Sequence, residues 1–227
     1  MYLRWQRSLP RWIRLVPIEL PGRGPRMSEP FIEDFDDLVE QLCEAHERHC
    51  NGHYALYGHS MGGLIAYGMA MRWRGLARRL PDVLFASASP APKHREPGYF
   101  ANKQTDAALI DDLRKQGGTP DEVFENAEML RITLDTLRAD YRVCSGYQYR
   151  DTQSLAVPIH VFAGRRDDIE AERILAWESE TCARFSVRWF DGGHFFIREH
   201  EAEILSAVTR HLVKEPAEVA HAPAMRA

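Results

Sequence analysis

The 227-residue chain is long enough for one domain with a substantial core and short for two. Hydrophobic residues make up 44% and charged residues 27%, as in an ordinary globular protein, and the formal net charge is −4. So mild a charge gives no electrostatic reason to expect nucleic acid or a membrane surface as a partner. No uninterrupted apolar stretch of about 18 residues occurs, so no bilayer-spanning helix is predicted.

Cysteine usage and the first residues indicate a cytoplasmic protein. Neither a CxxC pair nor the spacing of metal ligands occurs among Cys43, Cys50, Cys144 and Cys182. We therefore expect free thiols in a reducing compartment. The first twelve residues contain three arginines and lack the apolar centre of a signal peptide.

Short apolar runs and amphipathic segments alternate along most of the chain. The runs predict strands at 13–18, 54–57, 83–86, 159–163 and 187–190. Helical spacing of apolar residues predicts helices beginning near Phe35, Leu64 and Ile204. Strands that alternate with helices predict parallel βαβ units, and hence the α/β class with a mostly parallel sheet and helices on both faces.

The pattern changes between about residues 98 and 150. Apolar residues there recur at helical spacing without an intervening strand, for example Leu109 and Leu113, then Leu130, Leu134 and Leu137. We expect a helical insertion above the sheet, which would act as a lid on a single domain spanning 1–227. The tail 214–227, rich in alanine and proline, is expected to be disordered.

A nucleophile elbow is indicated by Gly58-x-Ser60-x-Gly62 between a predicted strand and a predicted helix. The motif alone is common, and its placement makes it specific. Ser60 must adopt a strained backbone on a sharp turn, and we expect a side chain at either glycine to collide with neighbouring backbone. The helix that follows would direct the Met61 N–H at an oxyanion formed beside Ser60.

The elbow architecture requires an acid and then a histidine later in the chain. Asp167 follows the predicted strand that ends at Gly164, and His194 follows the one that ends near Phe190. The carboxyl ends of parallel strands meet at one edge, so the sequence predicts a site made of Ser60, Asp167 and His194. On spacing alone, Asp168 remains an alternative acid.

The chain resembles the type II thioesterases, the stand-alone editing hydrolases of non-ribosomal peptide and polyketide assembly lines. The resemblance covers about 2–213, and its main motifs are Leu20-Pro21-Gly22-Arg23-Gly24, Gly58-His59-Ser60-Met61-Gly62-Gly63, Gly164-Arg165-Arg166-Asp167 with Trp177 downstream, and Gly192-Gly193-His194-Phe195-Phe196. Two further segments resemble the lid region of the family, Gly117-Gly118-Thr119-Pro120 and Leu137-Arg138-Ala139-Asp140. In this family the aspartate of the GxxD motif is the catalytic acid, which implies Asp167.

The resemblance implies an α/β-hydrolase fold and hydrolysis of aberrant or stalled acyl groups from the phosphopantetheine arms of carrier proteins. It implies no metal and no other cofactor, and a monomer is the default expectation. Two alternatives stay open. The chain could be a carboxylesterase of the same fold, since sequence patterns do not select thioesters over oxygen esters, or a truncated, non-catalytic partner that docks on a synthase.

The N-terminus departs from the family pattern. Members usually begin with a strand and a Pro-x-x-Gly-Gly turn, and Tyr2 and Trp5 resemble the helix that comes after this turn. The strand would lie at the sheet centre, between 13–18 and 54–57, and its turn would supply a second oxyanion N–H. We therefore expect the N-terminal strand to be missing here and the native protein to begin upstream of Met1.

Overall fold

The computed structural model describes residues 2–213. A four-stranded, all-parallel sheet lies at the centre of the fold. Its strands are adjacent in chain order: β1 (Ala55–His59), β2 (Val83–Ser87), β3 (Ile159–Gly164) and β4 (Phe185–Phe190). Every residue of β2 and β3 is buried, as expected for central strands covered on both faces. The predicted parallel α/β sheet is confirmed. The tail expected to be disordered lies outside the described residues.

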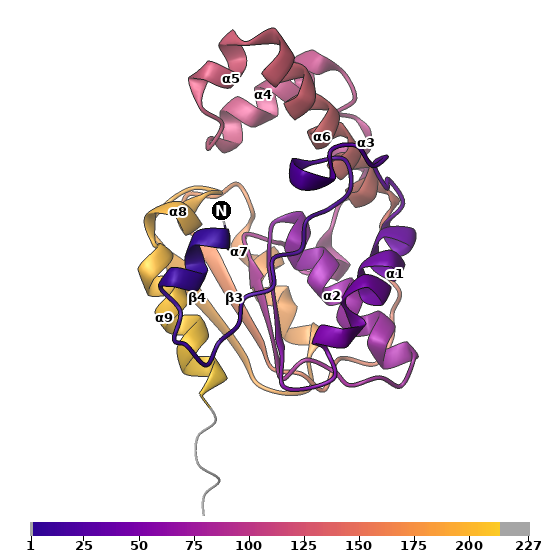
Figure 1. Ribbon diagram of the computed structural model, residues 1–227, viewed down its shortest axis with the longest axis vertical. Helices are drawn as coiled ribbons and strands as arrows, with labels where there is room; N and C mark the ends of the chain where they lie inside the picture. The colour runs from indigo at the N-terminus through magenta and orange to yellow at the C-terminus, as the bar shows by residue number, and fades with distance from the viewer. Residues whose placement is uncertain (1, 214–227) are drawn as a thin grey trace, which may run out of the picture.

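Helices cover both faces of the sheet (Figure 1). One face packs against α1 (Phe35–His46) and α2 (Met61–Gly75), and the other against α8 (Phe196–Glu199) and α9 (Glu201–Leu212). Successive side chains of β2 point to opposite faces of the sheet. Leu84 packs in the core on the side of α1 and α2, and Phe85 packs in the core on the side of α8 and α9. Shorter elements complete the core: η1 (Tyr2–Arg7), η2 (Gly24–Arg26), η3 (Glu47–His49), η4 (Pro92–His94), α7 (Ala171–Leu175) and η5 (Ala176–Glu180).

The predicted helical insertion is confirmed as four consecutive helices without a strand: α3 (Pro97–Ala101), α4 (Asp106–Gln116), α5 (Asp121–Glu125) and α6 (Ala127–Gly146). They lie beyond one end of the sheet (Figure 1). The insertion has its own small core around Leu109 and Leu134. It also encloses the carboxylate of Asp112, which accepts a 2.9 Å hydrogen bond from the Tyr141 hydroxyl and pairs with Lys103. We call α3–α6 the helical insertion.

The predicted strand at 13–18 is wrong, because this segment is irregular. A strand needs a neighbour that pairs with its N–H and C=O groups, and β1 pairs only with β2 among the described residues. The Gln6 side chain provides part of the hydrogen bonding that a neighbouring strand would provide. It accepts from the Leu15 N–H at 2.7 Å and donates to the Ile13 carbonyl at 3.1 Å. The apolar run had indicated a strand, but the pairing partner decides the conformation.

A buried histidine on β3 makes stability depend on pH. His160 is 6% exposed and stacks on His211 of α9 at a ring-centroid distance of 3.5 Å. Burial, reinforced by the charges of His211 and Arg184, lowers the pKa of His160 from 6.5 to about 4. Between these two pKa values, His160 is protonated in the unfolded chain and neutral in the folded chain. As the pH falls from 6.5 to 4, we expect His160 to lower the free energy of unfolding by about 1 kcal/mol per pH unit.

Urea titrations at neutral and mildly acidic pH test this expectation by comparing the wild type with His160→Phe. The phenyl ring keeps the aromatic stacking and cannot titrate. The variant should lose less stability on acidification than the wild type does. Equal losses in the two proteins would show that His160 is not a source of the pH dependence.

Candidate active site

Ser60 occupies the sharp turn between β1 and α2, as predicted. Its backbone angles are φ 55° and ψ −119°, a conformation that non-glycine residues rarely adopt. The Ser60 N–H donates to the Ser87 carbonyl at the end of β2 at 2.7 Å, which anchors the turn to the sheet. Met61 is the first residue of α2, so its N–H has no carbonyl partner within that helix. The Met61 N–H is therefore available beside the serine.

The two glycines of the elbow motif are not equivalent. A Cβ at Gly58 would overlap the backbone of Gly62 and Gly63, whereas a Cβ at Gly62 would meet no atom within 4 Å. Our expectation that a side chain at either position collides with backbone is therefore wrong for Gly62. The helix turns the outer face of Gly62 toward open space, while Gly58 lies under the first turn of α2.

This difference predicts opposite outcomes for two alanine substitutions. Gly58→Ala should destabilise the fold by about 3 kcal/mol or more, because rigid backbone would have to move. Gly62→Ala should keep the free energy of unfolding or raise it by up to about 1 kcal/mol, since alanine is the better helix former and its Cβ meets no atom. Denaturant unfolding of both variants measures the difference. Similar losses in the two proteins would contradict the assigned packing.

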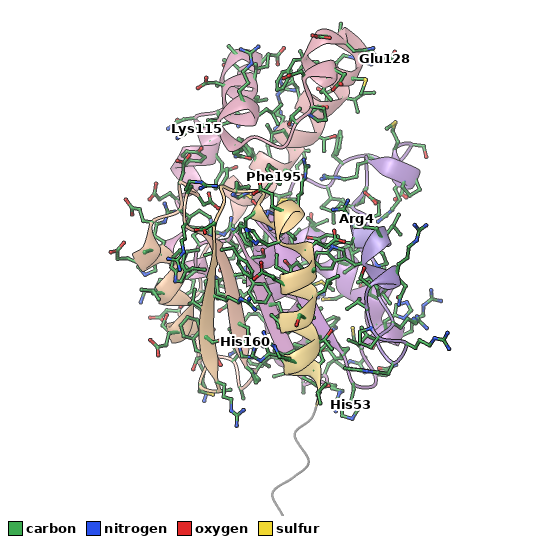
Figure 2. All side chains as sticks on the ribbon, turned by 90° about the vertical axis from the view of Figure 1, so that its left-hand side faces the viewer. Arg4, His53, Lys115, Glu128, His160 and Phe195 are labelled. Carbon is green, nitrogen blue, oxygen red and sulfur yellow. The ribbon has the colours of Figure 1, made fainter. Side chains whose placement is uncertain are left out.

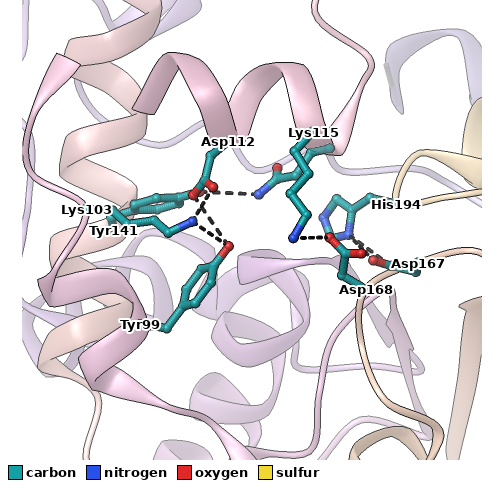
Figure 3. Close-up of polar contacts among 9 residues, drawn as sticks. Tyr99, Lys103, Asp112, Lys115, Tyr141, Asp167, Asp168 and His194 are labelled. Carbon is teal, nitrogen blue, oxygen red and sulfur yellow. Dashed lines mark hydrogen bonds and ion pairs between the residues drawn. The ribbon is translucent and has the colours of Figure 1, made fainter. Parts of the chain in front are cut away.

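Asp167 and His194 meet at the carboxyl ends of β3 and β4 (Figure 3). His194 Nδ1 donates to Asp167 Oδ2 at 3.0 Å and lies 3.3 Å from Oδ1. The two side chains are only 10% and 7% exposed. Asp168 has no ion pair with His194 and pairs instead with Lys115 of α4 at 3.0 Å, with 67% of its side chain exposed. The neighbouring carboxylates thus have different partners and different environments.

The Ser60 hydroxyl is not joined to His194 in this structure. Among the described residues it has no hydrogen-bond partner, although both residues lie at the same edge of the sheet. The His59 ring, one residue before the serine, lies 5.3 Å from the His194 ring between centroids. Catalytic hydrogen bonds are often long or poorly aligned without substrate and tighten in the substrate complex.

His59 lies beneath the elbow. Its Nδ1 is hydrogen-bonded to the Ser87 hydroxyl at 2.9 Å, and its ring stacks on Phe195 at 5.9 Å. Burial, followed by the charge of His194, lowers the pKa of His59 to about 3. A neutral ring therefore supports both the elbow and the loop that carries His194.

The helical insertion touches the loop that carries His194. The turn after α4 has positive φ at Gly117 and Gly118, and a Cβ at Gly118 would overlap the Phe195 ring. Arg198 also donates to the Gly118 carbonyl at 2.6 Å. Lys115 and Phe195 accordingly lie at the same end of the core, away from His160 (Figure 2). This turn therefore packs on the segment that follows β4, next to His194.

Two of the motifs that resemble the family, 20–24 and 137–140, are in contact with each other at the insertion. The Arg23 guanidinium, from the segment that begins at Leu20, forms a two-pronged ion pair with Asp140 of α6 at 2.6 and 3.0 Å. Both side chains are about 22–23% exposed. The pair joins residues 117 positions apart and fixes α6 to the core.

Sequence analysis did not identify Arg95, which lies beneath the elbow. Arg95 follows η4 and donates to the Ser60 carbonyl at 3.4 Å and to the Ser89 hydroxyl at 2.8 Å. In the sequence it stands in a polar run with Lys93, His94 and Glu96, which has the composition of an exposed loop. No local pattern distinguishes it.

Within residues 2–213, no helix is long and apolar enough to cross a membrane. The same residues contain no group of three or more histidine, cysteine, aspartate or glutamate side chains placed to hold a metal ion.

The family model described as the thioesterase domain matches residues 1–212. Linear gramicidin dehydrogenase LgrE of Brevibacillus parabrevis is 35% identical over 212 residues, covering 92% of this chain and 81% of the relative. The RedJ thioesterase from the prodiginine pathway of Streptomyces coelicolor has a TM-score of 0.85 and 32% identity, covering 92% of this chain and 84% of that one. The type II thioesterase BorB from the borrelidin cluster has a TM-score of 0.74 and 32% identity, covering 86% and 77%.

The name of LgrE refers to a dehydrogenase, whereas the family model and both solved structures are of thioesterases. The predicted α/β-hydrolase fold and the resemblance to type II thioesterases are confirmed by this agreement. The match extends over nearly the whole length of the described residues. The chain therefore belongs to the thioesterase domain family.

Proposed function

We propose that this chain removes aberrant or stalled acyl groups from the phosphopantetheine arms of carrier proteins in non-ribosomal peptide or polyketide biosynthesis. Type II thioesterases of these pathways act on carrier protein domains. In this proposal Ser60 is the nucleophile, His194 the general base, Asp167 the residue that orients His194, and the Met61 N–H an oxyanion donor. One observation carries it: the buried hydrogen bond from His194 to Asp167, at the edge where the strained turn presents Ser60.

The reaction begins when His194 Nε2 takes the Ser60 hydroxyl proton and the serine oxygen attacks the thioester carbonyl carbon. The carbonyl oxygen becomes an oxyanion, which the Met61 N–H and the N-terminal end of α2 stabilise. The carbon–sulfur bond then breaks, the acyl group remains on Ser60, and the pantetheine thiol leaves with the proton from His194. Water loses a proton to His194, attacks the acyl-serine and releases the acid, and the proton returns to Ser60.

The orientation of the imidazole depends on Asp167. Because the Nδ1–H bonds to the carboxylate, Nε2 is left unprotonated and can accept the serine proton. The carboxylate also stabilises the imidazolium that forms in each half of the reaction. A thiol is a good leaving group, so little protonation is needed when the carbon–sulfur bond breaks.

In this proposal the helical insertion admits the long, slender phosphopantetheine arm to the edge of the sheet where Ser60 lies. Its α4–α5 turn rests on Phe195, next to His194, so the insertion can cover an acyl chain attached to Ser60. The proposal also includes a monomer acting in the cytoplasm. The four cysteines, all free, support that compartment.

The decisive experiment measures product release from a panel of acylated carrier proteins by mass spectrometry, with the wild type and with Ser60→Ala. Nitrophenyl esters are tested in parallel. We expect the wild type to turn over acyl-carrier thioesters faster than the free esters, and Ser60→Ala to release nothing above background. Faster turnover of the free esters would favour a carboxylesterase, and no turnover of either by the folded wild type would favour a non-catalytic docking role.

A further inference from the structure

Arg95 places a largely buried positive charge directly beneath the nucleophile elbow. Its guanidinium contacts three segments that are distant in the chain: the Ser60 carbonyl at the start of α2, the Ser89 hydroxyl after β2, and Cys144 Sγ of α6 at 3.8 Å. Ser89 and Cys144 are themselves 0% and 3% exposed. The side chain therefore joins the elbow to the long helix of the insertion.

This charge is not neutralised by a neighbouring acid. None of the carboxylates in residues 2–213 forms an ion pair with Arg95, and its Nε atom is buried without a hydrogen-bond partner. Burial lowers the pKa of Arg95, but a guanidinium keeps its proton at any physiological pH. A partly buried charge without a carboxylate partner is costly for the fold, so its presence beside Ser60 needs an explanation other than stability.

The Ser60 carbonyl that Arg95 contacts belongs to the same peptide group as the Met61 N–H. In a trans peptide the carbonyl and the N–H point in opposite directions, so Arg95 lies on the opposite side of this peptide from an oxyanion bound by Met61. A cation at the carbonyl oxygen draws electron density toward it and strengthens the N–H as a donor. The Gly63 N–H, at 3.1 Å, donates to the same carbonyl and fixes the peptide plane.

We infer that Arg95 is a positioning residue of the oxyanion site: it orients and polarises the Ser60–Met61 peptide, and its uncompensated charge stabilises the negative charge that develops on the thioester oxygen. The inference rests on the proposed function, in which Ser60 is the nucleophile and Met61 the donor. Arg95 contacts the carbonyl side of the Ser60–Met61 peptide, opposite the N–H that would face the oxyanion, so we expect it to act on the transition state and not on substrate binding. Loss of Arg95 should therefore change kcat and leave KM alone.

The test replaces the charge while keeping the side chain's volume. Arg95→Met and Arg95→Gln remove the charge, and Arg95→Lys retains it. Arg184→Met is the matched control, because Arg184 is exposed at the opposite, amino-terminal end of β4. For each protein we would measure kcat, KM for an acyl-carrier thioester, the thermal midpoint of unfolding, and the affinity for a trifluoromethyl ketone, which forms an oxyanion adduct on a serine nucleophile.

We expect both neutral variants to lose about tenfold or more in kcat and a similar factor in ketone affinity, with KM unchanged. Arg95→Lys should retain more of both, and Arg184→Met should match the wild type. The neutral variants should shift the thermal midpoint only modestly, since removal of a partly buried charge offsets the loss of its hydrogen bonds to Ser60 and Ser89. A purely structural role would instead lower the unfolding midpoint and leave the ketone affinity of the folded fraction intact.

Wild-type kcat and ketone affinity in a folded neutral variant would overturn the inference, and so would losses in kcat that follow only the loss of folded protein. If Arg95→Met does not fold, Arg95→Gln provides the same test. The two proposals fail separately. Activity near the wild-type level in Ser60→Ala would reject the proposed function. A large loss in Ser60→Ala beside a fully active Arg95→Gln would reject only the role of Arg95.

Discussion

Replacing Ser60 with alanine is expected to lower kcat for acyl-carrier thioester hydrolysis by about 10⁵-fold, to a level set by the remaining binding and oxyanion groups. The loss is large because no acyl-enzyme can form without the serine oxygen. His194→Ala should give a similar loss, because the two residues act as one unit and removing either removes the same step. A double variant should then be scarcely worse than either single one.

Stability should not account for this loss. Alanine tolerates the backbone conformation of Ser60 as serine does, and the serine hydroxyl has no hydrogen bond to lose among the described residues. Ser179→Ala is a matched control, because its exposed hydroxyl bonds only the Ala176 carbonyl. A fluorophosphonate should add its mass to the wild type and to Ser179→Ala, and not to Ser60→Ala. Labelling of the folded Ser60→Ala protein at another residue would reject Ser60 as the nucleophile.

The neighbouring aspartates should respond very differently to the same substitution. Asp167→Asn is expected to lower kcat by about 10⁴-fold, because an amide can hold the imidazole in the wrong tautomer and cannot stabilise its charge. Asp168→Asn should change kcat by no more than about fivefold, since its exposed pair with Lys115 is worth at most about 1 kcal/mol.

Steady-state kinetics on one acyl-carrier substrate measure both variants, with unfolding midpoints as the check on folding. The two substitutions change charge and volume identically, so each is the control for the other. Equal losses would indicate a general electrostatic effect of this loop. A larger loss in Asp168→Asn would exchange the roles of the two residues.

Local patterns in the sequence were enough to predict the turn that carries Ser60. The glycine at position 58, the serine at 60 and the apolar runs on either side predicted the turn that the structure contains. The order of strands also predicted that the loops with Asp167 and His194 reach the edge where Ser60 lies. These inferences succeeded because a sharp turn depends on residues close together in the chain, and because strands that alternate with helices run parallel and end at a common edge.

Only the tertiary structure decided which groups actually meet. Residues 13–18 have a strand-like composition but no strand beside them, and Gly62 faces open space where a collision was expected. Asp167 and Asp168 are chemically identical neighbours, and only the path of the loop turns one toward His194 and the other toward Lys115. Arg95 gave no signal at all. Pairing, burial and side-chain direction depend on residues far apart in the chain, so no local pattern contains them.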